Sequence, residues 1–216
     1  MTTPAARRYQ TVVAAQAAAT AGAGEQVVGS QYELMLAKLY NDKRRLKDIQ
    51  SIERKIEVKR EILPEYATWI DGVLAAGKGG QDEVLTTAMV WHVDAGNYEE
   101  ALRIGAYVLE HDLTLPDQYE RTPATVLVDE ISDAALAVQK NEKPFPMQIL
   151  LELQAITADL DMPDQARAKL HKALGYELHQ RGNLQDAEKH YARALELNDR
   201  IGVKRDLKEI QSALES

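Results

Sequence analysis

Apolar residues recur along most of the chain at the three- and four-residue spacing of amphipathic helices. Between residues 32 and 63 the pattern follows a seven-residue register, in which seven of the ten core positions are apolar. Asp42, Glu53 and Arg60 occupy the other three positions. This register predicts one long helix that pairs with another helix, and Pro64 is expected to end or bend it.

Shorter helices are predicted for the rest of the chain, because no segment shows the alternating pattern of a strand. Thr122 and Pro123 are typical of a helix N-cap and first turn. The expected helices end near Gly77 or span about 81–95, 98–112, 122–137, 147–159, 163–180, 184–197 and 203–214, with a loop at 140–146. The predicted fold class is therefore all-α, with a long N-terminal helix followed by helical hairpins.

The run GYELHQRGNLQDAEKHYARALELN, at residues 175–198, resembles a tetratricopeptide unit. Such a unit needs a small residue where its two antiparallel helices touch and large apolar residues toward its neighbours. Gly175, Ala187 and Tyr191 fit these spacings, and a weaker echo occurs at 96–112. Two distant units do not make a solenoid, so an ordinary helical hairpin is the alternative interpretation.

The pattern divides the chain into four parts. Residues 1–29 are alanine-rich and contain no Leu, Ile or Phe, so a flexible N-terminal arm is predicted rather than an export signal or membrane segment. Residues 30–63 are expected to form the long basic heptad helix, and residues 64–160 a central helical region. Residues 161–216 are expected to form a tetratricopeptide-like hairpin with a capping helix.

The net charge of -8 is distributed unevenly. Residues 38–60 contain nine Lys or Arg and four acidic residues, so this window carries +5 and the remainder of the chain carries -13. Such an excess, with Arg7 and Arg8 upstream, is suited to nucleic-acid phosphates. The alternative interpretation is a solvated helix on which Lys and Arg alternate with Glu.

Motifs for catalysis or metal binding are weak. The chain has no cysteine, which excludes disulfides and thiolate metal sites and favours a reducing compartment. GVLAAGKG, at residues 72–79, has the spacing of a phosphate-binding loop, but Gly79 stands where a hydroxyl should hold magnesium. The adjacent acidic pairs diverge on helices, and the histidines lack the spacing of a zinc protease. No catalytic residue, metal site or cofactor is therefore predicted.

Four runs occur in order over about residues 30–205: YELMLAKLYNDKRRLK, KREILPEYATWIDGVLAAGKGGQDEVLTTAMVWHVDAGNYEEALRIGAYVL, ERTP and DMPDQARAKLHKALG. Together they resemble the gpM-type small terminase subunit of tailed temperate bacteriophages, a family also labelled as the terminase endonuclease subunit. The resemblance implies a DNA-packaging protein in the cytoplasm of the infected bacterial host. Its implied partners are double-stranded viral DNA and a large ATPase and nuclease subunit, with no membrane, and such subunits assemble into rings.

The main hypothesis is therefore a DNA-recognition subunit that is not itself catalytic. Its predicted DNA contacts are the basic residues of the arm and the long helix: Arg7, Arg8, Lys38, Lys43, Arg44, Arg45, Lys47, Arg54 and Lys55. The predicted subunit contacts, in a homo-oligomer larger than a dimer, are the heptad residues Leu39, Leu46, Ile49 and Ile56. Residues 163–214 are expected to bind the large subunit.

Two other functions stay open at this point. One is a metal-dependent endonuclease that cuts the packaging site itself, as the family label suggests. The other is a helical-repeat scaffold that does not bind DNA. Magnesium-dependent cleavage by the subunit alone would favour the first, and the absence of salt-dependent DNA binding would favour the second.

Overall fold

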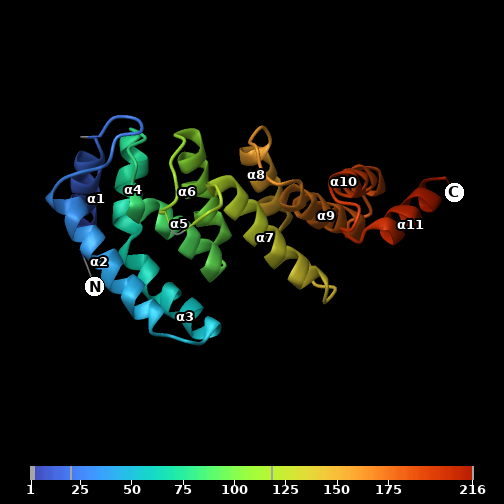
Figure 1. The fold of residues 1–216 in the computed structure, drawn as a ribbon, viewed down its shortest axis with the longest axis horizontal. Coiled ribbons are helices and arrows are strands. Elements are labelled where there is room, and N and C mark those ends of the chain that lie inside the picture. The colour runs from blue at the N-terminus through green and yellow to red at the C-terminus, as the bar shows by residue number, and fades with distance from the viewer. Residues whose placement is uncertain (1–2, 20, 118, 216) are drawn as a thin grey trace. The chain divides into compact units, whose positions relative to one another are not determined.

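The computed structural model describes residues 3–19, 21–117 and 119–215, and these fold almost entirely into helices (Figure 1). Among them are eleven α-helices and one short 3-10 helix, and their β structure is limited to an isolated bridge between Gln26 and Gln81. The all-α prediction is confirmed. The chain divides into two compact units, unit 1 (Met1–Pro123) and unit 2 (Ala124–Ser216).

Unit 1 is built from six α-helices and the 3-10 helix. These are α1 (Pro4–Ala18), α2 (Ser30–Lys47), α3 (Ile52–Ile62), η1 (Leu63–Glu65), α4 (Ala67–Ala76), α5 (Glu83–Ala95) and α6 (Tyr98–Glu110). Tyr66, Ile70, Leu85 and Met89 are fully buried and form the centre of its core. The helices predicted to end near Gly77 and to span about 81–95 and 98–112 are confirmed as α4, α5 and α6.

The prediction of one continuous helix over residues 30–63 is wrong. Helix α2 ends at Lys47 and α3 begins at Ile52, where the Ser51 hydroxyl accepts a hydrogen bond from the Arg54 N–H at 3.2 Å. A Ser N-cap of this kind stabilises a new helix start. The heptad register instead serves the core of unit 1, because Leu39 and Leu46 are buried within their own chain.

The N-terminal segment is also more ordered than the predicted flexible arm. Pro4–Ala18 forms α1, and the hydroxyl of its N-cap Thr3 accepts a hydrogen bond from the Ala6 N–H at 3.2 Å. Small residues let α1 approach α4 closely, since a Cβ at Gly72 would lie only 2.5 Å from the Ala14 Cβ. Residues 1, 2 and 20 of the predicted arm lie outside the described residues.

The GKGGQD run joins several parts of unit 1. Gly79 has a φ of 66° and donates its N–H to the Tyr107 hydroxyl at 2.8 Å. Gln81 exchanges backbone hydrogen bonds with Glu25 and Val27, at 2.7 and 3.1 Å. These contacts tie the segment after α1 to the start of α5, so the run has a structural role.

Asp82, the last residue of this run, is the N-cap of α5. It is fully buried, and its carboxylate accepts hydrogen bonds from the Leu85 N–H at 3.0 Å and the Trp69 indole N–H at 2.8 Å. Burial raises the pKa of Asp82 to about 6, although both hydrogen bonds oppose the change. The Tyr32 ring stacks on Trp69, with ring centroids 5.7 Å apart, and so packs α2 against α4.

Unit 2 consists of helical hairpins whose boundaries agree with the predicted ones. Its helices are α7 (Pro123–Gln139), α8 (Met147–Thr157), α9 (Asp164–Gln180), α10 (Leu184–Leu197) and α11 (Lys204–Leu214). Between α9 and α10 a Cβ at Gly175 would lie 2.6 Å from the Tyr191 ring, which explains the small residue there. Val203 and Ile210 cover this hairpin from α11, as the predicted capping helix required.

Candidate nucleic-acid interface

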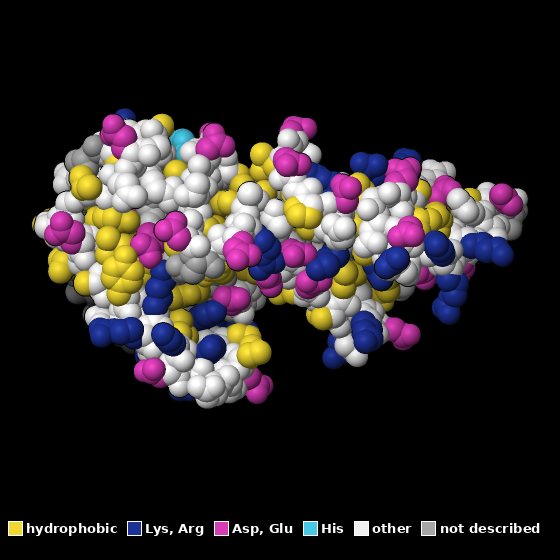
Figure 2. Space-filling model, in the orientation of Figure 1, with side chains coloured by type: hydrophobic (Ala, Val, Ile, Leu, Met, Phe, Trp, Pro, Cys, Tyr) yellow, Lys and Arg dark blue, Asp and Glu magenta, His cyan; other side chains and the backbone are white. Residues whose placement is uncertain are grey.

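Lysine and arginine side chains gather over α2 and α3 in Figure 2, in the part of the surface that belongs to unit 1. Helix α2 ends with Arg44, Arg45 and Lys47, and the last turn of α3 carries Lys59 and Arg60. Cations in the last turn of a helix are favoured because they oppose the negative end of its dipole. The concentration of charge therefore has a local structural cause. The partners of each cation show whether its charge is neutralised inside the protein or is available to a ligand.

Lys38 is held inside unit 1. Its ammonium group lies 2.8 Å from Asp42 and 2.9 Å from Glu65, and 4.8 Å from the centroid of the Tyr66 ring. Partial burial disfavours the charged form, but the hydrogen bonds to the two carboxylates outweigh it and raise the pKa of Lys38. This lysine stabilises the packing of α2 on η1 and is a poor candidate for a DNA contact.

Lys43 is used in the same way. Its ammonium group lies 2.7 Å from Glu83 in the first turn of α5, and the Tyr40 hydroxyl donates to the same carboxylate at 3.0 Å. The Lys43 side chain is only 23% exposed. A phosphate would have to break this half-buried pair before binding Lys43.

Arg45 and Arg54 converge on one acidic residue. Glu61 lies 3.0 Å from the Arg45 guanidinium and 3.6 Å from that of Arg54, and Arg54 also pairs with Glu57 at 2.7 Å. These pairs are half-exposed, so each stabilises the fold weakly. The alternative interpretation of the basic segment, a solvated helix on which Lys and Arg alternate with Glu, therefore holds for Arg45 and Arg54.

The other predicted cations keep their charge available. Among the described residues, Arg7 and Arg8 on α1, Lys47 at the end of α2 and Lys55 on α3 have no ion pair, and Arg44 contacts only the Asn41 amide. All but the partly covered Lys55 are exposed. The nine candidates therefore separate into four paired cations and five that remain free to meet phosphates.

The predicted subunit contacts lie in two environments. Leu39 and Leu46 are buried in the core of unit 1, so the chain itself accounts for them. Ile49, in the turn after α2, and Ile56, on α3, are partly exposed. No second chain is needed to explain the heptad residues of α2.

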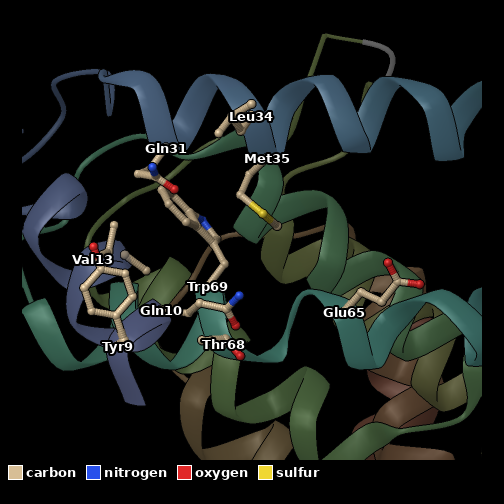
Figure 3. A pocket seen from close by; sticks show the side chains of 10 residues that line it. Tyr9, Gln10, Val13, Gln31, Leu34, Met35, Glu65, Thr68 and Trp69 are labelled. Carbon is tan, nitrogen blue, oxygen red and sulfur yellow. The ribbon is translucent and has the colours of Figure 1, made fainter. Parts of the chain in front are cut away.

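A cavity between α1, α2, η1 and α4 was missed by the sequence analysis. Its volume is about 180 Å³. Its lining is partly apolar, from Tyr9, Val13, Ala14, Leu34, Met35 and Trp69, and partly polar, from Gln10, Gln31, Glu65 and Thr68. Figure 3 shows Met35 and Trp69 projecting into the space below α2, with Tyr9 and Val13 at the side formed by α1. The sequence signal for it is weak, because residues 1–29 lack the strong helical periodicity that would have predicted a docked α1.

The described surface of unit 1 offers positive charge rather than a group of catalytic or metal-binding side chains. In the part of the chain that the structure describes, no three His, Asp or Glu side chains are grouped so that they could hold a metal ion. No helix in that part has the length and hydrophobicity needed to cross a membrane. Unit 1 therefore presents exposed cations without an acidic partner among the described residues, together with a partly apolar cavity.

Comparison with known proteins adds two family matches. Residues 36–165 match the family model described as "Phage small terminase subunit", and residues 168–201 match the tetratricopeptide repeat model. The second match agrees with the hairpin of α9 and α10.

Two curated relatives have terminase names. The chain is 39% identical over 214 residues to "Terminase, endonuclease subunit" of Escherichia phage P2, covering 99% of this chain and 86% of the relative. It is 22% identical over 121 residues to "Probable terminase, endonuclease subunit" of Haemophilus phage HP1 (strain HP1c1), covering 54% of this chain and 43% of that relative. No solved structure matches the chain.

Proposed function

The chain belongs to the phage small terminase subunit family, and from that premise we propose that unit 1 binds double-stranded viral DNA by its phosphates. As the small subunit it acts in phage DNA packaging, with viral DNA and the large terminase subunit as its partners. The proposed place of this work is the cytoplasm of the infected bacterial host, where the viral DNA is packaged.

The observation that supports phosphate binding is the set of cations without an acidic partner among the described residues. It consists of Arg7, Arg8, Arg44, Lys47 and Lys55. Phosphate contacts gain their free energy by releasing counterions from DNA. A free surface cation gains this free energy in full, whereas a paired one such as Lys43 must first break its ion pair with the Glu83 carboxylate. The paired cations are therefore expected to contribute less.

We propose that residues 163–214 of unit 2 bind the large subunit. This region contains the hairpin of α9 and α10 and its covering helix α11, and it includes the tetratricopeptide match. Helical hairpins of this kind present extended surfaces to other proteins. DNA and the large subunit would then bind to different units of the chain.

We also propose that the subunit works as a homo-oligomer larger than a dimer, and that it closes into a ring. Each free cation of unit 1 contributes only a weak contact with DNA. Several copies on one duplex would convert these weak contacts into strong binding, since every contact after the first forms within the same complex.

Replacing Arg7 and Arg8 together by Ala tests the DNA contact. Each lost phosphate contact should reduce the slope of log affinity against log salt by roughly 0.9, so the double variant should lose about 1.8 per engaged subunit. Binding should weaken equally for cognate and unrelated DNA, because phosphates carry no sequence information. Fluorescence anisotropy of labelled duplexes at several salt concentrations measures both quantities.

The matched control removes the same charge from unit 2. Lys140 and Lys143 are exposed in the loop between α7 and α8, so their double Ala variant should keep the wild-type slope. Helix content and solution mass must stay unchanged in both variants. An unchanged slope in the Arg7 and Arg8 variant, or no salt-dependent binding by the wild type, would argue against the interface and favour a scaffold without a DNA role.

The printed names of the two relatives motivate one alternative, an endonuclease activity in the subunit itself. It predicts that the purified subunit cleaves DNA with magnesium and without the large subunit. Loss of cleavage in EDTA, together with its dependence on an acidic residue of this chain, would be required to accept it.

A further inference from the structure

We propose that the outer face of α11 is the part of unit 2 that binds the large terminase subunit, and that it binds an acidic segment of that protein. This inference rests on the large-subunit site proposed above for residues 163–214. It adds the side chains that make the contact and the chemistry of their partner.

Helix α11 and the loop before it carry a second concentration of positive charge, outside the basic window of residues 38–60. Residues 200–208 contain four basic residues and one acidic residue, so this segment carries +3. Figure 2 shows Lys and Arg side chains over α11, at the right of the view. All four cations of the segment are exposed: Arg200, Lys204, Arg205 and Lys208.

The charge of these four cations is not neutralised within the protein. None of them has an ion pair among the described residues. Asp206, the acidic residue of the segment, is partly buried and close to Tyr191, where it adds to the effect of burial in raising the pKa of that tyrosine. The cations are therefore available to an anionic partner.

The position of the cations in α11 has no local structural cause. Lys204 and Arg205 open the helix, at the positive end of its dipole, where cations are disfavoured. Lys204 and Lys208 are four residues apart, so they lie on one face of the helix, where like charges repel. In α2 and α3 the cations instead occupy the last turns, which the dipole favours. Binding of an anionic partner would offset both costs in α11.

The basic face is held in a fixed orientation. Val203 and Ile210 are fully buried against the hairpin of α9 and α10. Lys172 on α9 donates a hydrogen bond to the Ile201 carbonyl at 2.8 Å, and so holds the loop that carries Arg200. The cations are thus presented to the solvent by a packed helix and an anchored loop.

An acidic protein segment fits this face better than DNA does. Exposed Asp199 and Glu209 flank the basic segment, and they would repel a phosphate backbone that continues past it. An acidic segment that ends between them would avoid this repulsion. Leu214 is 40% exposed on the same helix and offers an apolar contact that a protein can use and phosphates cannot. The adjoining hairpin matches the tetratricopeptide repeat over residues 168–201, and repeats of this kind bind other proteins.

Reversal of two charges tests the contact. Lys204→Glu combined with Lys208→Glu should preserve the fold, because both side chains are exposed and a glutamate at position 204 is favoured by the helix dipole. Affinity for the purified large subunit, measured by fluorescence anisotropy of the labelled chain at low salt, should fall by roughly tenfold. Most of the salt dependence of this affinity should be lost as well.

The matched control makes the same charge change elsewhere in unit 2. Lys140→Glu combined with Lys143→Glu alters two exposed lysines of the loop between α7 and α8. This variant should bind the large subunit as the wild type does. An equal loss of affinity in this control would mean that net charge alone decides binding, and would overturn the inference.

Replacing the same two lysines by arginine tests the chemistry of the partner. Lys204→Arg combined with Lys208→Arg keeps the charge, so affinity for the large subunit should be unchanged. A carbodiimide joins lysine amines to carboxylates that contact them. The wild type should therefore give cross-links from Lys204 or Lys208 to Asp or Glu of the large subunit, detected by mass spectrometry, and the arginine variant should lack them.

Three other results would overturn the inference in different ways. Unchanged large-subunit affinity in the glutamate variant would remove the α11 contact and leave the remainder of residues 163–214 as the proposed site. Loss of DNA affinity in that variant, with large-subunit affinity unchanged, would assign the face to DNA. A wild-type chain that does not bind the large subunit would remove the proposed site together with the inference.

Discussion

Helix α2 in unit 1 and the hairpin of α9 and α10 in unit 2 both bury a stripe of apolar residues, but their partners lie at different distances along the chain. Lys43 on α2 pairs with Glu83, 40 residues away. His171 on α9 contacts His190 on α10, 19 residues away and across one tight turn. The contact between α9 and α10 is therefore made by neighbouring segments, whereas α2 is held by a distant helix, as α9 also is where Lys169 pairs with Asp129, 40 residues away.

This difference explains how each region uses its charges. The ion pairs of α10 join residues near one another in sequence, Lys189 with Asp186 and Arg193 with Glu196, whereas Lys169 on α9 pairs with Asp129 and Asp133 of α7. In unit 1, distant acidic residues such as Glu83 and Glu65 neutralise some cations of the basic helix and leave others free. A charge count along α2 overestimates its available charge, because it does not include these distant partners.

The largest expected effect comes from substitutions at the close helix–helix contacts within each unit. In Gly72→Ala the new Cβ would lie 2.5 Å from the Ala14 Cβ and 2.7 Å from the Thr11 carbonyl oxygen, which is backbone of α1. Overpacking of this kind costs about 1–3 kcal/mol. We expect α1 to detach from α4, which protease cleavage between α1 and α2 and urea unfolding followed by tryptophan fluorescence would detect.

Gly175→Ala is the corresponding change in unit 2. Its Cβ would meet the Tyr191 side chain at 2.6 Å, and the ring of Tyr191 is buried, so unit 2 should also lose stability. Gly77→Ala is the control, because that position has a φ of 59° and no atom within 4 Å. It should cost only about 1 kcal/mol of backbone strain. If Gly72→Ala costs no more than Gly77→Ala, the close packing of α1 on α4 is wrong.

The elements that the sequence could predict are those whose partners are adjacent. The helices of unit 2 begin and end where caps and turn residues indicated, and Gly175 and Tyr191 meet as the tetratricopeptide spacing required. The break between α2 and α3 had a local signal in Ser51, but the heptad register continued across it and favoured one helix.

The candidate site was less predictable, for two physical reasons. Glu83, the partner of Lys43, and Glu65, the second partner of Lys38 after the neighbouring Asp42, lie far away in sequence, so these pairs depend on the tertiary fold. The docking of α1 depends on the absence of a side chain at Gly72, a steric match that no periodicity in residues 1–29 reveals. The basic residues could be identified from the sequence, but the division into paired and free cations could not.

A smaller effect is expected from pH, with opposite signs for the His171 and His190 pair of unit 2 and for Asp82 of unit 1. Burial, then the neighbouring His190 and Arg193, lower the pKa of His171 to about 4, and burial also lowers the pKa of His190. Both histidines bind protons more readily in the unfolded chain. Their contribution to the stability of unit 2 is therefore complete above pH 6.5 and is lost as pH falls toward 4.

Asp82 in unit 1 behaves in the opposite way. Its pKa is raised to about 6 from an unfolded value of 3.8, so its favourable contribution is present below 3.8 and is lost as pH rises through 6. Both tryptophans lie in unit 1, so their fluorescence follows its unfolding, while hydrogen exchange of α9 and α10 follows unit 2. His190→Gln should flatten the response of unit 2, and Asp82→Asn that of unit 1. Equal pH profiles in the wild type and both variants would contradict these assignments.

The smallest effect should separate two neighbouring cations of α2. Arg44 is exposed and contacts only the Asn41 amide among the described residues, whereas Lys43 is half-buried against Glu83. Arg44→Ala should reduce the slope of log DNA affinity against log salt by roughly 0.9 per engaged subunit. It should change the free energy of unfolding by no more than about 0.5 kcal/mol, as is usual for a surface substitution.

Lys43→Ala should show the reverse pattern. The Glu83 carboxylate loses its cation and keeps only the Tyr40 hydroxyl and solvent, so we expect a loss of stability of about 1 kcal/mol and little change in the salt slope. Urea unfolding and anisotropy titrations on the same preparations measure both quantities. The two variants remove the same charge from adjacent residues, so net charge alone predicts equal salt slopes. Equal slopes would therefore mean that ion pairing inside unit 1 does not decide which cations meet DNA.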